Sequence, residues 1–183
     1  GEEMIGIGLS ALAVGSGGEA GGIFFGGLAV GSGGDLTGIA ASLGGVGAGR
    51  NLYGIAAGGL ATGVGQSGEG VFFGGLAVGF GKDMTGMAMS AGVFASNGRM
   101  RGLGIGGVGA MVKDINGVVL GGLINGASSE GWSFRVYTET TVGIQIGLLN
   151  FTRHLRGFQF GLLNYAGNNP KWAKLLPIMN IHL

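Results

Sequence analysis

A glycine returns every sixteen residues along most of this chain, and this period limits the folds that the chain can adopt. One residue is missing before Gly117, ten extra residues precede Gly143, and Gly157 follows Gly143 after only fourteen residues. Self-similarity at a short fixed period is typical of stacked repeat folds, in which each unit buries its apolar side chains against its neighbours. The repeats start at these glycines: Gly6, Gly22, Gly38, Gly54, Gly70, Gly86, Gly102, Gly117, Gly143 and Gly157.

Within each repeat, the apolar residues indicate short β-strands. The consensus is G-I-x-Φ-G-G-L-A-V-G-x-G-G-D-L-T, where Φ is apolar. Apolar residues occupy the second and fourth positions of every repeat and the seventh and ninth of most, whereas strict strand alternation would place them at every second residue. The fifth position holds only Gly or Ser, so we expect a bulge or tight corner there. After this corner the large side chains are expected to face the same interior as before it.

The third and eighth positions are then expected to face outward. They hold mostly Ala in the early repeats, and in the last two repeats they hold polar residues, namely Gln145, Gln159, Asn150 and Asn164. Two large aromatic residues, Phe24 and Phe72, stand at third positions. On an outward face of small residues they become candidate interaction residues, because an apolar patch on a sheet surface is suited to binding another surface.

One architecture accounts for the period, the corner and the polar turns together. The chain is predicted to be all-β, a Gly-rich β-solenoid of about ten coils, in which two short strands and a polar turn make one coil. Leu36, Leu52, Met84 and Met100, in the turns, would point back inward. At about 4.8 Å per coil the rod would be about 50 Å long. The alternative is an antiparallel β-meander or barrel of about 12 strands in an outer membrane.

The chain is predicted to be one repeat domain over residues 1–183, with repeats at 6–127 and 142–166. Residues 128–141 are an insertion that we expect to form a loop or hairpin, and it holds Trp132, Arg135 and Tyr137. Residues 167–183 abandon the repeat. A solenoid must close its open end, so this segment is predicted to be a C-terminal cap that uses Trp172, Leu175, Leu176 and Ile178.

Composition excludes several classes of function. Charged residues are only 10% of the chain, glycine contributes 47 of 183 residues, and the net charge is +1. No basic cluster of the kind that binds nucleic acid is present, and no cysteine is available for a disulfide or a zinc-thiolate site. The low charge leaves few charged side chains for a surface in water. We therefore expect either that something other than bulk water covers part of the protein or that the exposed face is mostly glycine and alanine.

Residues that could carry chemistry are few. Glu19, Asp35 and Asp83 share the fourteenth position, but Asn51 and Arg99 interrupt the row, and an arginine would repel a calcium ion. These acidic residues are therefore interpreted as turn residues. His154 and His182 have no second ligand or nucleophile near them in the sequence. We predict no metal, no cofactor, no small-molecule substrate and no enzymatic activity.

The last two repeats read GIQIGLLNF and GFQFGLLNY, and they are followed by NNPKWAKLLPIMNIHL. They resemble the G-[IV]-Q-[IL]-G-L-[LV]-N repeats of uncharacterised bacterial exported or surface repeat proteins. The resemblance covers residues 143–183 closely and the Gly/Ala-rich repeats loosely. It implies a bacterial, exported protein, and it supplies no activity and no catalytic residues.

These observations together predict a non-enzymatic structural or interaction protein of the bacterial cell envelope or surface. It is expected to associate through flat Gly/Ala-rich apolar sheet faces, by self-association, with an envelope protein partner, or in contact with a membrane. The candidate interaction residues are Phe24, Phe72, Trp132, Arg135 and Tyr137. No signal peptide is visible in the sequence, so an exported protein would be in its mature form. The alternative is an integral outer-membrane barrel acting as a scaffold or narrow pore.

Overall fold

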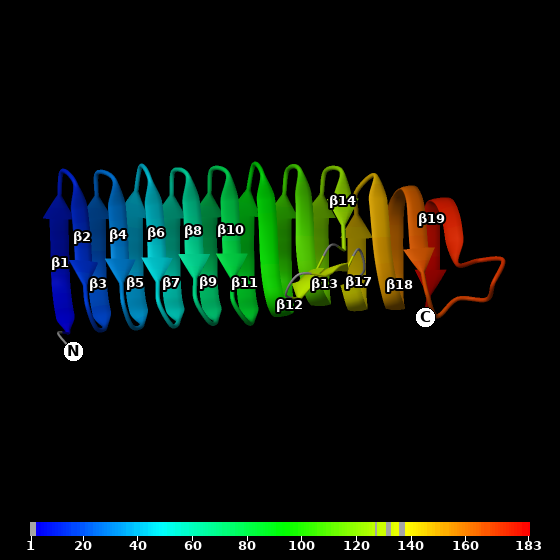
Figure 1. The fold of residues 1–183 in the computed structure, drawn as a ribbon, viewed down its shortest axis with the longest axis horizontal. Helices are drawn as coiled ribbons and strands as arrows, with labels where there is room; N and C mark the ends of the chain where they lie inside the picture. Colours follow the sequence, from blue (N-terminus) through cyan, green and yellow to red (C-terminus); the bar gives the residue numbers. More distant parts are fainter. Residues whose placement is uncertain (1–2, 127, 131–132, 136–137) are drawn as a thin grey trace.

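The chain folds into a β-solenoid, seen in a computed structural model that describes residues 3–126, 128–130, 133–135 and 138–183. None of these residues forms a helix. The described chain makes about nine turns, which at about 4.8 Å each gives a rod about 43 Å long. Figure 1 shows the coils stacked side by side, with the N-terminus at one end of the rod and the C-terminus near the other.

Each regular coil contributes one strand of seven residues and one of four, so the solenoid has two sheet faces (Figure 1). We call them the long face and the short face. Strands β12, β13 and β18 run through both faces. The long face contains β1 (Met4–Ser10), β3 (Ala20–Gly26), β5 (Leu36–Ser42), β7 (Leu52–Gly58), β9 (Gly68–Gly74), β11 (Met84–Ser90), β17 (Thr138–Ile146), and parts of β12 (Val93–Gly106), β13 (Gly109–Gly121) and β18 (Leu149–Ala166).

The remaining strands complete the short face, the insertion and the C-terminal end. The short face contains β2 (Ala13–Ser16), β4 (Ala29–Ser32), β6 (Gly45–Ala48), β8 (Ala61–Val64), β10 (Ala77–Phe80), β14 (Ile124–Asn125) and the first residues of β12, β13 and β18. Strands β15 (Ser128–Glu130) and β16 (Ser133–Arg135) form the insertion, and β19 (Leu175–His182) ends the chain. Within a coil, the chain turns from the long strand to the short strand at the sixth and seventh positions, and we call this side of the rod the corner edge. The polar turn from the short strand to the next long strand lies on the opposite side, which we call the turn edge.

Strand pairing confirms the predicted solenoid. Neighbouring strands are parallel and offset by one repeat, so that Leu36 pairs with Leu52 and Ile39 with Ile55. Antiparallel pairing in the described chain is limited to β15 with β16 and β18 with β19. The antiparallel meander is therefore wrong for these residues, because it would require each strand to reverse relative to its neighbour.

The recurring glycine is required by the backbone. Gly38 and Gly54 have φ values of 117° and 125°, in a region that L-residues with a side chain rarely adopt. A Cβ atom on Gly54 would also collide with the carbonyl oxygen of Gly38 in the preceding coil. Both constraints return in each coil, and they explain why the sequence keeps a glycine at this spacing.

The predicted orientation of the side chains is wrong for most of the repeat. The interior is filled from the third, fifth, ninth, eleventh and fifteenth positions, so strand alternation is kept on both sides of the corner. The second, fourth and seventh positions, which were expected to be internal, lie on the outer surface. The ninth and fifteenth positions are internal as predicted, with Val30, Val78, Leu36 and Met100 as examples.

A tight corner does follow the fifth position, as predicted. Gly26, Gly58 and Gly74 end their long strands. A Cβ atom on Gly58 would collide with the carbonyl oxygen of Ala61, three residues later. The chain therefore needs a very small residue here to turn from one face to the other. The large side chains after the corner were predicted to face the interior, and they do not. The seventh-position side chain, such as Leu60, points outward from the corner and is exposed.

Large core side chains are accommodated by glycines of the same coil or of a neighbouring coil. Phe72 and Phe80 pack edge to face with ring centroids 4.9 Å apart, and Gly68, in the same strand as Phe72, lies against both rings. Gly8, in the preceding coil, lies in the same way against Phe24, at a site where a Cβ atom would be 2.9 Å from the ring. The interior between the two sheets is narrow, so these rings fit where a nearby glycine leaves space.

The polar residues of the last repeats are internal, in contrast to their predicted outward position. The Nδ2 group of Asn125 donates to Oδ1 of Asn150 at 2.7 Å, and Asn150 donates in turn to Oδ1 of Asn164 at 2.8 Å. Gln159 donates to Oε1 of Gln145 at 2.7 Å. All five side chains are buried. The core therefore changes from an apolar ladder to hydrogen-bonded amide ladders, which satisfy most of the polar groups that would otherwise be costly to bury. Oδ1 of Asn125 and Oε1 of Gln159 have no hydrogen-bond partner among the described residues.

The two irregular segments take the predicted general forms with different details. The insertion forms the antiparallel hairpin β15–β16, and β17 already begins at Thr138, so the repeat resumes earlier than residue 142. Strand β19 closes the C-terminal end by pairing with β18. Of the predicted cap residues, Trp172, Leu175 and Ile178 are exposed, and the buried side chains of this end are those of Asn169, Ala173 and Asn180.

Candidate interaction surface

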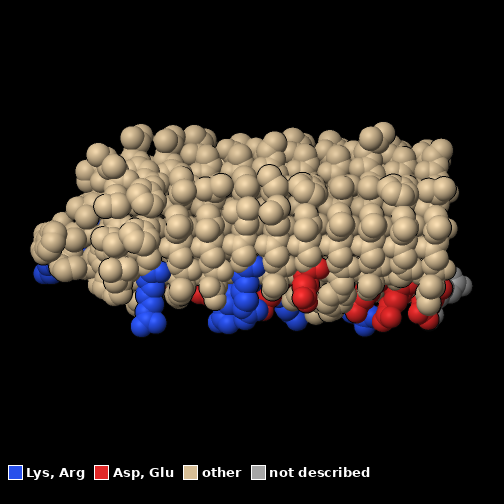
Figure 2. Space-filling view, turned by 180° about the vertical axis from the view of Figure 1, so that it is seen from behind, with Lys and Arg blue, Asp and Glu red and all other residues tan. Residues whose placement is uncertain are grey.

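The charged side chains lie at the turn edge, and a large continuous surface carries none (Figure 2). In the sequence, no Lys, Arg, Asp or Glu occurs from the recurring glycine through the corner to the end of the short strand. This holds for residues 22–32, 38–48, 54–64, 70–80, 86–96, 102–112, 117–126, 143–152 and 157–169. Eleven consecutive uncharged residues per regular coil therefore cover most of both faces and the whole corner edge.

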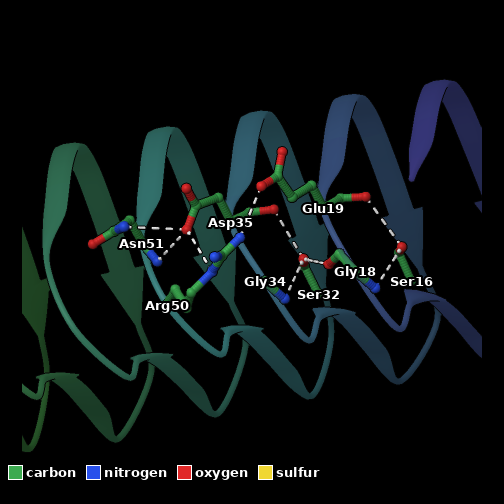
Figure 3. Close-up of polar contacts among 8 residues, drawn as sticks. All are labelled: Ser16, Gly18, Glu19, Ser32, Gly34, Asp35, Arg50 and Asn51. Atoms are coloured by element: carbon green, nitrogen blue, oxygen red, sulfur yellow. Dashed lines mark hydrogen bonds and ion pairs between the residues drawn. The ribbon is translucent and has the colours of Figure 1, made fainter. Parts of the chain in front are cut away.

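The turn edge is held together by bonds between successive coils (Figure 3). Oδ1 of Asp35 accepts hydrogen bonds at 3.1 Å from the backbone and side-chain amides of Asn51, and Oδ1 of Asn51 accepts from the backbone of Ser67 at 3.2 Å. Arg50 pairs with Glu19 at 2.8 Å and with Asp35 at 3.4 Å. These acidic residues thus bind neighbouring turns, in agreement with their interpretation as turn residues.

The outer surface of the long face consists of two rows of apolar side chains. The second position forms one row, with Ile23, Ile39 and Ile55 exposed. The fourth position forms the other, with Phe25 and Phe73 exposed and the smaller Ala41 and Ala57 between them. Each side chain lies over the next at the strand spacing, because the strands are in register. A large exposed apolar patch of this kind is typical of a site that binds another protein, a ligand or a membrane.

The corner edge carries a row of leucines, interrupted at Ala91 and Gly92, on a backbone with paired amides. Leu43 is 80% exposed and Leu60 is 57% exposed. The backbone N–H of Leu60 donates to the carbonyl of Gly44 at 2.7 Å, and the N–H of Leu76 donates to the carbonyl of Leu60 at 2.7 Å. The corner amides therefore bond to the preceding coil, and the edge presents side chains rather than free donors.

A shallow apolar groove runs along the solenoid beside the corner edge. Its floor is made of residues at the fifth and sixth positions, which are small except for Leu43 and Leu148, and its wall is made of the fourth-position side chains. The part nearest the C-terminus has a volume of about 540 Å³ and is bounded by Ile105, Leu120, Ile146 and Phe160. Further segments continue it toward the N-terminus, past Phe73 and Met89, then Ala57, and finally Phe25 and Leu9.

The short face is smooth, because its outward rows contain only alanine and glycine from β2 to β10. The eighth position was predicted to face outward, and Ala29, Ala61 and Ala77 do so. No heavy atom lies within 4 Å of a Cβ built on Gly63 or Gly79. The ten residues of these two rows are Ala13, Gly15, Ala29, Gly31, Gly45, Gly47, Ala61, Gly63, Ala77 and Gly79.

The predicted interaction residues are placed differently from expectation. Phe24 and Phe72 are 1% and 0% exposed, so their assignment to a surface is wrong; the third position faces the core, where a ring fills the space left by glycine. Trp132 and Tyr137 lie outside the described residues. Arg135 ends β16. Sequence reasoning missed the exposed row of corner leucines. The absence of charged residues from the same segments could have indicated this surface.

Residues with catalytic potential are not gathered at one place. Nδ1 of His182 lies 2.6 Å from Oδ1 of Asn169 in the C-terminal end, whereas His154 is exposed on β18. In the part of the chain that the structure describes, no group of three or more His, Asp or Glu residues is placed to hold a metal ion. Over the same residues, no helix has the length and apolarity needed to cross a membrane.

Comparisons with known proteins found no match. No protein family, no curated protein and no solved structure matches the chain.

Proposed function

We propose that this β-solenoid repeat protein is a non-catalytic structural component of a bacterial cell envelope, and that it associates through its short face with a second copy. The observation that carries the proposal is the smooth, uncharged pair of Ala/Gly rows from β2 to β10. The resemblance of residues 143–183 to repeats of exported bacterial proteins supports the location in the envelope.

The geometry of the short face favours another sheet of the same kind. Sheets that face each other normally lie about 10 Å apart, and side chains no larger than a methyl group permit a closer approach. Two copies have the same spacing between coils, so an alanine row of one copy can lie along a glycine row of the other. Neither surface contributes a charge that would have to be removed from water.

The size of the short face predicts weak association. Its smooth part consists of the five strands β2, β4, β6, β8 and β10, which span about 24 Å, and four residues per strand give a width of about 13 Å. Each copy can therefore bury about 310 Å², and the pair about 620 Å², which is below the ~1,000 Å² of a stable specific interface. We expect a dimer whose population depends on protein concentration.

The experiment is sedimentation velocity on the full chain and on the variant Gly31→Lys/Gly63→Lys. Both positions can hold a side chain, because the nearest atom to a Cβ on Gly31 is 3.9 Å away and none lies within 4 Å at Gly63. The variant should remain folded and sediment as a monomer where the natural chain is dimeric. A matched control, Thr37→Lys/Thr85→Lys, adds the same charge to the long face and should stay dimeric. A natural chain that is monomeric at every concentration would refute the proposal.

A further inference from the structure

We propose that the corner edge inserts into the hydrocarbon of one leaflet of a lipid bilayer and that the groove beside it holds acyl chains. This inference goes beyond the proposed self-association and uses a different surface. The solenoid would lie with its long axis in the plane of the membrane, with the corner leucines deepest and the turn edge in water.

The distribution of charge matches a lipid–water interface. Figure 2 shows the charged side chains along one edge of the rod, opposite the corner edge. The uncharged segment of each regular coil is centred on the corner, as at residues 54–64 with Leu60 near the middle. A row of charged groups on one side and large apolar groups on the other is the pattern that places a peptide in a membrane interface.

The backbone of the corner edge is compatible with hydrocarbon. A polar group that enters the bilayer core must have a hydrogen-bond partner within the protein. At the corner, the N–H of Leu28 donates to the carbonyl of Leu12 at 2.6 Å, and the N–H of Gly59 donates to the carbonyl of Ser42 at 2.9 Å. Each coil thus supplies the acceptors for the corner N–H groups of the next coil. Insertion therefore removes water from the leucine side chains without placing unpaired amides in hydrocarbon.

The height of the long face agrees with the thickness of one leaflet. Five residues separate Tyr53, at the sixteenth position, from Gly58, where the straight strand ends at the corner, which at about 3.3 Å per residue is about 17 Å. Half of a hydrocarbon core of about 30 Å is about 15 Å. With the leucines at the leaflet's centre, Tyr53 and Glu69 at the sixteenth position would lie at the headgroups. Tyrosine is enriched at this level in membrane proteins.

The groove favours an acyl chain over a peptide. Its fourth-position wall is apolar, as shown by Ile105 and Phe160. The corner amides beside it are already bonded to neighbouring coils. A peptide lying there would leave its own backbone groups without partners, whereas a hydrocarbon chain has none to satisfy. Four coils of the groove are about 19 Å long, so it can accept an extended chain along the rod.

The first test is flotation of the full chain with vesicles of pure phosphatidylcholine. Because the net charge is only +1, we expect the chain to float with these neutral vesicles at both low and high salt. The variant Leu28→Asp/Leu60→Asp changes two exposed corner residues and should lower the partition coefficient by about tenfold or more, since a carboxylate enters hydrocarbon poorly. The control Thr37→Asp/Thr85→Asp places the same charges beside the turn edge and should float like the natural chain.

A second measurement does not depend on how the Asp variant folds. The chain has no cysteine, so Leu60→Cys and, on the turn edge, Asn97→Cys each give one labelling site for a polarity-sensitive fluorophore. Addition of vesicles should shift the emission of the Leu60→Cys label to the blue and leave the Asn97→Cys label unchanged. A shift that rises with protein concentration in the absence of lipid would mean that a second copy covers the corner edge, and it would overturn the proposal.

The test separates this inference from the proposed self-association. The Gly31→Lys/Gly63→Lys variant changes only the short face and should still float with vesicles. Absence of flotation in the natural chain would refute the lipid proposal while leaving the sedimentation result untouched. Flotation of a natural chain that never dimerises would refute the self-association and support the lipid proposal.

Discussion

Gly68 offers the sharpest test of how the narrow core is filled. The residue is buried at the fifteenth position, where other coils carry Leu52 or Met84. A Cβ atom there would lie 2.9 Å from Cζ of Phe72 and closer still to the ring of Phe80. The φ of Gly68 is outside the left-handed region, so backbone strain does not contribute. The variant Gly68→Ala therefore tests overpacking alone.

We expect Gly68→Ala to lower the free energy of unfolding by about 1–3 kcal/mol, the usual cost of extra atoms in a packed core. Phe80→Ala removes the ring that crowds this site and should cost about 3–5 kcal/mol through the cavity. In the double variant the new methyl group occupies part of that cavity. The two changes should then be coupled by about 1–3 kcal/mol, with the double variant more stable than the sum of the single effects.

Thermal and urea unfolding, followed by circular dichroism, would give these free energies. For a chain of this size about 1 kcal/mol corresponds to about 2–4 °C in Tm. The control is Gly63→Ala, an outward glycine with open space, which should change stability by less than about 1 kcal/mol. Additive effects of Gly68→Ala and Phe80→Ala, within about 0.5 kcal/mol, would show that the glycine does not make room for the ring.

Three further outcomes are expected. Deletion of residues 38–53 should remove one coil and leave a shorter folded rod, as measured by size and circular dichroism, because Leu36 takes the place of Leu52. Deletion of residues 54–69 instead puts Leu52 in the place of Gly68, against the rings of Phe72 and Phe80, and should lower Tm markedly. Asn150→Ala removes hydrogen bonds of 2.7–3.0 Å from a buried ladder and should cost at least about 1–3 kcal/mol in urea unfolding. Arg50→Ala breaks half-exposed ion pairs and should cost less than about 1 kcal/mol; a larger loss in a thermal melt would contradict the screening argument.

Much of the fold was predictable because the constraints on it are local and periodic. A glycine such as Gly54 is required by its φ and by the carbonyl of the preceding coil, and both requirements return once per coil. Small residues at Gly58 and Gly74 were also correctly linked to a corner. Turn residues such as Asp35 and Asn51 were placed at the edge where they bond to each other.

The orientation of the strands was not predictable from the apolar pattern. Alternation tells which residues share a side but does not tell which side is internal, and here both sides lack charge. The larger side chains, such as Ile55 and Phe73, were taken for the core, yet they are exposed. The same ambiguity assigned Phe72 to the surface and Asn150 to solvent. Only the contact between the rings and Gly68 and the ladder of amide side chains reveal that these residues are internal.

The sequence by itself determined the coil length and the edge that carries charge, because each follows from a residue that recurs at one spacing. Tertiary structure decided that the strands pair in parallel and which residues fill the interior. Two sheets joined by a two-residue corner enclose a narrow interior, so Ala40 and Val46 line part of it, Leu52 and Met84 fit near the turn edge, and a ring such as Phe72 fits beside Gly68.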